Sequence, residues 1–207
     1  MHIDLVIYPR DKYSGILNSR VFISYGVELH DILYVMIIAV VLHNIRSVHN
    51  VGSIFRTADA AGVEKIYLCG ITPTPHDRFG NLRKDFMKVA LGAEKSLLWN
   101  SEKSTLRVIN ALKKDGWKIF AVEQSKQSIP YFKLKISDKK MKIALILGDE
   151  VRGLPPKVLK LADQILEIPM RGTIVRDATH PKHSGSGKES LNVSVAFGVI
   201  VFALRYP

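Results

Sequence analysis

The sequence predicts an α/β fold with a mostly parallel central sheet. Short apolar runs rich in Val, Ile and Leu alternate along the chain with segments of helical periodicity, which is the pattern of repeated strand–helix units. Gly or Pro separates most of these segments. The chain has 207 residues, of which 47% are hydrophobic, so it is long enough to bury a substantial core.

Five apolar runs predict the strands, because each is short and has no helical period. In chain order they are Val35–Leu42, Lys65–Cys69, Trp117–Val122, Lys142–Leu147 and Gln164–Ile168. The first run is apolar throughout, as expected for a strand that is buried on both faces of a parallel sheet.

Four segments predict the helices. They are Val51–Ala61, Thr105–Asp115, Lys157–Ala162 and Leu191–Tyr206. Gly62 and Gly116 follow the first two and suit C-terminal caps, and Pro155 suits the first helical position of the third. Asn50 and Ser190 are the residues expected to cap the N-termini of the first and the last helix.

The remaining stretches carry fewer signals. Residues 71–85 are expected to form a loop and residues 124–140 a polar, basic surface excursion. Residues 1–34 are an extension without a motif, and the domain is expected to cover residues 35–207. Because Met36 would serve as a translation start, the sequence leaves open whether the extension is native.

The charge balance favours a polyanionic partner, nucleic acid first. Thirty Lys and Arg residues against nineteen Asp and Glu residues give a formal net charge of +11. Nine lysines fall between residues 113 and 142, where Tyr131 and Phe132 are interleaved; most should form a solvated face and some should track phosphates. The loop 73–83 adds two arginines, and either RNA positioning or a plain surface loop accounts for it.

Cysteine and hydropathy patterns exclude several classes of protein. Cys69 is the single cysteine, which rules out an internal disulfide framework and a multi-cysteine zinc site and indicates a reducing, cytoplasmic compartment. The apolar run 32–42 has eleven residues, too few to span a bilayer. We therefore expect neither a membrane nor a metal partner.

Three loops that follow strong strand signals carry the polar residues that suggest chemistry. The first reads NIRSVHNVGSIFRTADAAG and enters a helix, and the second reads LILGDEVRGLP across a strand end. The third consists of IPMRG and, after a long loop, ESLNVSVAFG. Ligands of parallel sheets bind beyond the carboxyl ends of the strands, so these loops are the candidate site.

Together these segments resemble the three signature motifs of the SpoU/TrmH branch of the SPOUT superfamily of RNA methyltransferases. The resemblance covers roughly residues 36–206. It implies a deep trefoil knot, a homodimer, the cofactor S-adenosylmethionine (AdoMet), and methylation of a ribose 2′-hydroxyl in tRNA or rRNA. None of these properties follows from composition or periodicity.

The resemblance also implies roles for individual residues. Those that match the family's catalytic motif positions are Asn50, Arg56, Glu150, Ser190 and Asn192. Those that match positions lining or adjoining the AdoMet pocket are Gly148, Ile168, Met170 and Leu191. Arginine is a poor general base because its pKa lies above about 12, so a bidentate clamp on an RNA phosphate is the role we expect for Arg56.

One departure from the family pattern leaves alternatives open. Residues 173–188 form an insertion between the two parts of the third motif, where the family loop is usually short. If the insertion disables the pocket, the chain is a non-catalytic RNA-binding homologue. A second alternative is a related SPOUT enzyme that methylates a base. The stretch 182–189 fails the phosphate-loop pattern, which excludes a nucleotide hydrolase.

Overall fold

The computed structural model describes residues 36–136, 140–170 and 191–206, and every structural statement below refers to these residues. They form a seven-stranded sheet in the order β3-β2-β1-β6-β4-β7-β5, and each neighbouring pair is parallel. The strands are β1 Ile37–His43, β2 Lys65–Cys69, β3 Leu98–Glu102, β4 Lys118–Val122, β5 Ile129–Pro130, β6 Lys142–Leu147 and β7 Gln164–Glu167.

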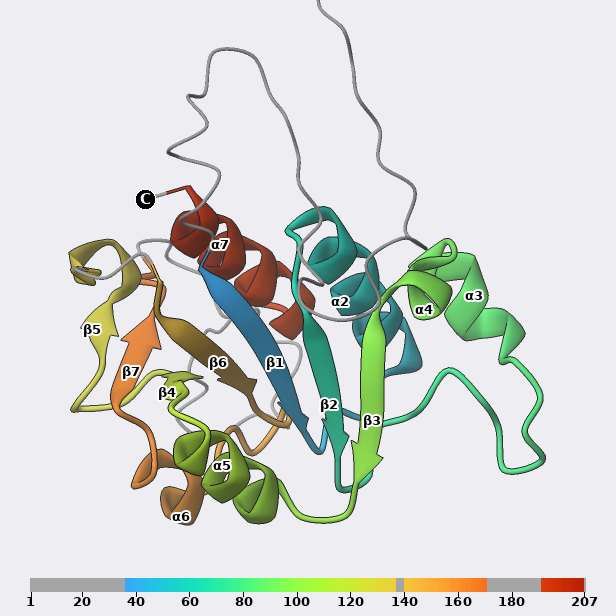
Figure 1. Cartoon of the computed structure of the whole chain (residues 1–207), viewed down its shortest axis with the longest axis horizontal. Helices are drawn as coiled ribbons and strands as arrows, with labels where there is room; N and C mark the ends of the chain where they lie inside the picture. The colour runs from blue at the N-terminus through green and yellow to red at the C-terminus, as the bar shows by residue number, and fades with distance from the viewer. Residues whose placement is uncertain (1–35, 137–139, 171–190, 207) are drawn as a thin grey trace, which may run out of the picture.

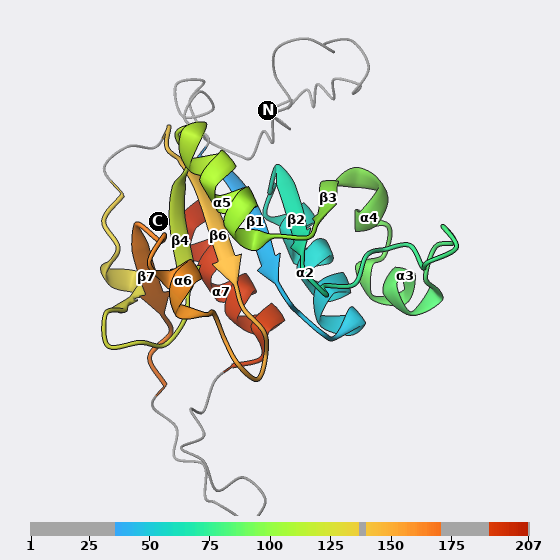
Figure 2. The ribbon, with the colours of Figure 1, turned by 90° about the horizontal axis from the view of Figure 1, so that it is seen from below.

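Helices cover both faces of the sheet, as Figure 1 and Figure 2 show. On one face lie α2 Val48–Ala60, α3 Lys84–Ala90, α4 Ala93–Ser96 and α7 Val193–Arg205 with the 3-10 turn η1 Tyr131–Lys133. On the other lie α5 Thr105–Lys114 and α6 Pro156–Leu159. No helix among the described residues is long and apolar enough to cross a bilayer.

The central strands supply both layers of the core because successive side chains of a strand point to opposite faces. In β1, Ile38, Val40 and Leu42 are buried against α2 and α7, whereas Val41 is buried on the side of α5 and α6. Strand β6 alternates in the same way. The apolar run predicted for the first strand is therefore confirmed as a strand buried on both faces.

The strand order creates a switch point between β1 and β6. The chain runs from β1 outward to β2 and β3, then returns on the opposite side at β4, while β6 pairs with both β1 and β4. The loops after β1 and β6 thus leave the same edge of the sheet side by side. Open parallel sheets bind their ligands at such a point.

The predicted strands and major helices are confirmed, but the sequence missed the edge of the sheet. Strand β3 and helices α3 and α4 were not predicted, because β3 is partly exposed and mixes polar with apolar residues. The segment 124–140 was wrongly expected to be only a surface excursion. It contains β5 and η1, and Tyr131, Leu134 and Ile136 pack against the core.

Three expected helix starts were also wrong. The cap of α2 is Ser47, whose hydroxyl accepts a hydrogen bond from the Asn50 backbone amide, so Asn50 lies inside the first turn. Helix α7 is capped by Asn192 rather than Ser190. Pro155 is the cap of α6, which occupies only four residues. Ser, Asn and Pro all favour helix N-termini, so neighbouring candidates could not be separated by residue type.

Candidate active site

The first and third motifs meet the second motif at the carboxyl edge of the sheet. Glu150, in the turn after β6, accepts a hydrogen bond of 2.9 Å from Asn50 Nδ2 in the first turn of α2. It also accepts bonds from the backbone amides of Arg46 at 3.1 Å and Ser47 at 3.4 Å. One carboxylate therefore fixes the loop between β1 and α2.

Asn50 continues this contact to the last helix. Its Oδ1 accepts a 3.0 Å hydrogen bond from Asn192 Nδ2, and Asn192 Oδ1 accepts bonds from the backbone amide and the hydroxyl of Ser194. Because Asn50 donates to a carboxylate and accepts from an amide, its carboxamide is held in one orientation. The structure thus brings together Glu150, Asn50 and Asn192, three of the residues singled out in the sequence.

The Glu150 carboxylate is held ionised by this environment. Burial on its own would raise the pKa of Glu150, but the hydrogen bonds from Asn50 and from the Arg46 and Ser47 amides outweigh it and leave the pKa below its usual value. A carboxylate of low pKa is a weak proton acceptor. Its geometry suits positioning rather than general-base catalysis.

Asp149 and Arg46 are site residues that the sequence analysis missed. Asp149 Oδ1 accepts 2.8 Å hydrogen bonds from the Val151 and Arg152 amides, and its Oδ2 accepts 3.0 Å from Arg46 Nε. Burial opposes ionisation here too, yet these donors lower the pKa of Asp149. The partners lie 103 residues apart in sequence, so only the sheet order could have revealed the Arg46–Asp149 pair.

Gly148 and Glu123 shape the same turn. A Cβ on Gly148 would lie 2.6 Å from the Gly153 carbonyl carbon and 2.7 Å from the Leu154 nitrogen, so the turn folds directly against the bare Gly148 backbone. The carboxylate of Glu123, which follows β4, accepts a 2.8 Å hydrogen bond from the Leu154 amide. Glu123 was not singled out either, although its place after a strand end was a signal.

A half-buried polar cluster lies behind the first motif. His43 Nδ1 is 2.7 Å from Thr105 Oγ1, and Asn44 Nδ2 is 3.1 Å from His43 Nε2. The Asn44 Nδ2 group can only donate, because the Asn44 Oδ1 atom accepts from the Ile71 amide, so His43 Nε2 accepts and Nδ1–H donates to Thr105. Burial lowers the pKa of His43, an effect that the nearby Asp149 charge partly offsets. Burial also raises the pKa of Cys69 to about 11, so its thiol stays protonated.

Arg56 does not contact the group formed by Glu150, Asn50 and Asn192. It lies six residues beyond Asn50 on α2, roughly 9 Å along the axis at 1.5 Å per residue, and it faces another direction. Its exposed side chain lines a hollow with Ser53, Thr57 and Phe202, between α2, α3 and α7. Within a single chain, the arginine and the Glu150 cluster therefore occupy different faces.

The residues expected to line the cofactor pocket lie at the ends of β6 and β7 and just before α7. Ile168 packs against the core after β7, whereas Met170 is 41% exposed beyond it. Leu191 is half-buried and adjoins the α7 cap. Ser190 and the insertion 173–188 lie outside the described residues.

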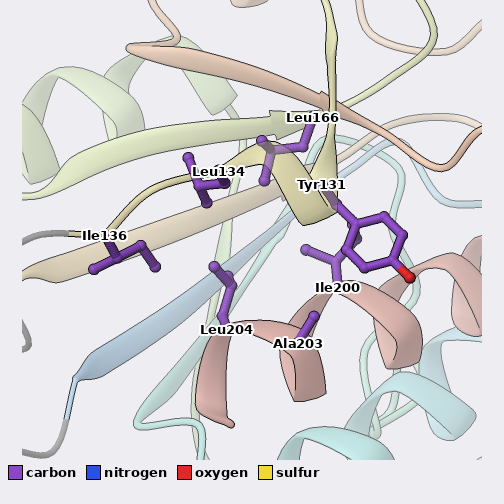
Figure 3. Close-up of a pocket in the computed structure, with 7 residues that line it drawn as sticks. All are labelled: Tyr131, Leu134, Ile136, Leu166, Ile200, Ala203 and Leu204. Carbon is purple, nitrogen blue, oxygen red and sulfur yellow. The ribbon is translucent and has the colours of Figure 1, made fainter. Parts of the chain in front are cut away.

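An apolar cavity beside the core is too small to be the cofactor site. It lies between η1, β7 and α7, is lined largely by apolar side chains such as Leu166 and Ile200, and has a volume of about 40 Å³ (Figure 3). Drug-sized ligands occupy roughly 300–1,000 Å³. This cavity is a packing space beside the core rather than a binding site.

Comparisons with known proteins identify relatives of the whole described domain. A model of the SpoU rRNA Methylase family matches residues 37–175. A 23S rRNA (guanosine-2'-O-)-methyltransferase from Ralstonia nicotianae is 28% identical over 93% of this chain and 69% of its own length. A tRNA (guanosine(18)-2'-O)-methyltransferase from Aquifex aeolicus is 27% identical over 77% of this chain and 64% of its own length.

Solved structures agree on the fold. An AdoMet-bound rRNA methyltransferase from Sinorhizobium meliloti has a TM-score of 0.66 and 25% identity, covering 82% of this chain and 56% of that one. A TrmH/SpoU tRNA modifying enzyme from A. aeolicus has a TM-score of 0.62 and 24% identity, covering 81% of this chain and 73% of that one. The chain thus spans between about half and three quarters of the length of these relatives.

Proposed function

Because the chain belongs to the SpoU rRNA methylase family, we propose that it methylates the ribose 2′-hydroxyl of a guanosine in rRNA or tRNA, with AdoMet as the methyl donor. The observation that carries this proposal is the hydrogen-bonded chain Glu150–Asn50–Asn192, which joins the three motifs at the switch point of the sheet. Relatives named as guanosine 2'-O-methyltransferases of 23S rRNA and of tRNA support the substrate class.

The residues at this edge fit the proposed cofactor. AdoMet would supply the methyl group from its positively charged sulfonium, and the neutral thioether S-adenosylhomocysteine would be the leaving group. Asp149 and Glu150 place two ionised carboxylates at the end of β6, which suits a cation, and the apolar Ile168 and Met170 follow β7. Gly148, Ile168, Met170 and Leu191 are the residues that we propose to hold it.

The chain's own residues orient the reaction and bind RNA. Glu150 fixes Asn50, and Asn50 fixes the start of α7, so the three loops keep one arrangement for an in-line attack. Ser190 matches the third-motif serine and is proposed to act beside Asn192. Arg56, with its planar guanidinium, is proposed to clamp an RNA phosphate.

We propose that the chain acts as a homodimer through the α2–α7 face. Phe202 and Val195 of α7 are 39% and 50% exposed, and Arg56 lies beside Phe202. Because Arg56 is remote from its own Glu150 cluster, pairing over this face would let it act on RNA bound to the other protomer. Exposed apolar patches on a helix face suit such an interface.

Three finer features complete the proposal. The deep trefoil knot that the sequence motifs imply is part of this proposal, and α7 lies beside α2 although the strand before it, β7, lies near the opposite edge of the sheet. Residues 35–207 would form the methyltransferase domain, since the family model begins at residue 37. A cytoplasmic location accords with RNA as substrate and with the buried Cys69 thiol.

Calorimetric titration with AdoMet and with S-adenosylhomocysteine tests the cofactor site. Binding of both at micromolar concentrations is expected for the full chain, and Asn50→Ala should weaken it because the three loops lose their shared contact. Absence of binding would favour the non-catalytic RNA-binding alternative, unless deletion of residues 173–188 restored it.

A further inference from the structure

A small hairpin between β2 and α3 carries an exposed aromatic side chain that the core does not use. The hairpin, residues 76–82, is closed by an antiparallel bridge between His76 and Leu82, and the loop that contains it projects from the β3 side of the sheet (Figure 1). Phe79 at its tip is 72% exposed. A single exposed Phe is common on protein surfaces, so its meaning here depends on how the tip is held and on what surrounds it.

The tip is held rigidly in this exposed state. Asp77 Oδ1 accepts hydrogen bonds from the amides of Phe79 at 2.8 Å and Asn81 at 2.9 Å. The Asp77 amide donates to the Asn81 carbonyl at 2.8 Å, and the Gly80 amide donates to the Asp77 carbonyl at 3.1 Å. Bonds from Asn81 and Phe79 lower the pKa of Asp77, so the turn is fixed at neutral pH.

The hairpin base is tied to the candidate active site. The His76 ring lies 5.8 Å from the Trp99 ring of β3, and the Arg83 amide donates to the Pro75 carbonyl. The loop begins at Ile71, whose amide donates a 3.1 Å hydrogen bond to Asn44 Oδ1, at the start of the first motif. Through β2 and Asn44 the hairpin therefore has a fixed position relative to Asn50.

The chemistry of the tip suits an unpaired nucleobase. The Arg78 guanidinium lies over the Phe79 ring, 4.7 Å from its centroid. Phe79 keeps 72% exposure with Arg78 against it, so much of the ring surface is open. Aromatic rings and arginine planes are the surfaces on which proteins stack unpaired bases, whereas a paired base has no free face.

The surrounding charge also suits RNA. The hairpin, α3 and the α3 cap Arg83 carry the exposed or half-exposed cations Arg78, Arg83, Lys84 and Lys88 against the two carboxylates Asp77 and Asp85. Asp77 is engaged by backbone amides and Asp85 lies 3.7 Å from Arg83 Nε. The remaining positive charge complements a phosphate backbone.

We propose that the 76–82 hairpin docks substrate RNA by stacking an unpaired base on Phe79, with Arg78 beside it. This role rests on the proposed function, because it names how RNA is held relative to the methylation site. It predicts a preference for RNA with unpaired nucleotides near the target ribose.

Fluorescence anisotropy of the full chain tests the proposal. Two labelled probes are compared, a stem–loop RNA whose loop is unpaired and a duplex RNA with the same stem sequence. Phe79→Ala should weaken binding of the stem–loop RNA about tenfold and leave the affinity for the duplex RNA unchanged. Phe79→Trp should bind the stem–loop RNA as tightly as the wild type does, because Trp keeps a stacking surface. The matched control is Leu98→Ala, which should leave RNA affinity unchanged, since Leu98 is a 53% exposed apolar residue of β3 that has no aromatic ring on which a base could stack.

Three results would overturn the proposal. In the first, Phe79→Ala and the wild type bind the stem–loop RNA with equal affinity. In the second, the wild type does not bind the stem–loop RNA. In the third, Phe79→Ala loses self-association while its affinity for RNA is unchanged. The last would assign Phe79 to a second copy of the chain. Calorimetry with AdoMet tests the proposed function separately. If the chain binds AdoMet but Phe79→Ala does not change its RNA affinity, only the role of residues 76–82 is rejected.

Discussion

Asn50 is the residue on which the candidate site depends, because it donates to Glu150 and accepts from Asn192. Asn50→Asp removes the donor and places two carboxylates in contact, so we expect a loss of about 1–3 kcal/mol in the free energy of unfolding and a large loss of activity. Adding Glu150→Gln supplies a new donor on the opposite partner and should recover part of the stability. Urea unfolding of the single and double variants measures this coupling; strictly additive effects would contradict it.

The acidic pair in the second motif predicts how stability depends on pH. Native Asp149 and Glu150 have pKa values below the ordinary 3.8 and 4.5, so they stabilise the fold fully above those values. The contribution is lost as the pH falls through the lower native pKa values. The urea concentration at the midpoint of unfolding should therefore decrease as the pH is lowered below about 4.5, and it should decrease less steeply in Glu150→Gln. An identical pH profile for this variant would contradict the role of Glu150.

Gly148 predicts a steric effect at a single residue. Gly148→Ala would push Cβ against the backbone of Gly153 and Leu154, and we expect a loss of about 1–3 kcal/mol. The control is Gly198→Ala in α7, where the nearest atom to a Cβ is Thr57 Cγ2 at 3.8 Å and Ala favours the helix. Equal unfolding midpoints for the two variants would contradict the packing of this turn.

The sequence patterns indicated some of the residues that the structure brings together and missed others. The motifs pointed to Asn50, Glu150 and Asn192, which the structure connects. They did not reveal Asp149 and Arg46, since an ion pair between distant segments leaves no local pattern. Arg56 was expected in the same site, but helical geometry turns it away from Asn50.

At the scale of elements, strands with continuous apolar runs were predictable because burial on both faces leaves an unmistakable composition. The edge strands β3 and β5 were not, since β3 exposes polar residues and β5 has two residues. Helix α2 was predicted but its start was misplaced by three residues, because Ser47 and Asn50 are both good caps.

Helix α7 is fastened at its end by Arg205, which gives a prediction for the element as a whole. Its guanidinium donates to the carbonyls of Met36 at 2.7 Å, Ala61 at 2.9 Å and Gly62 at 2.9 Å. Lysine cannot reach three carbonyls in this fork, so Arg205→Lys should lose about 1–3 kcal/mol in urea unfolding. A loss as small as that of the exposed Arg107→Lys would contradict this fastening.

At the scale of the whole molecule, the α2–α7 face predicts the oligomeric state. Phe202→Glu should convert a dimer to a monomer and abolish methyl transfer, because Arg56 would no longer reach the other protomer's RNA. Phe132→Glu changes a Phe of η1 that is more exposed than Phe202 and should leave the dimer intact. Sedimentation velocity distinguishes the two, and a Phe202→Glu dimer with full activity would contradict the proposed interface.

The proposed function makes one chemical claim about the molecule, that the methyl group reaches a ribose oxygen. The most direct measurement is mass spectrometry of nucleosides after the purified chain has acted on total rRNA and tRNA with isotopically labelled AdoMet. Labelled 2′-O-methylguanosine is expected with the wild-type chain and should be absent with Asn50→Asp. Label on a base, or no label on RNA although AdoMet binds, would contradict it.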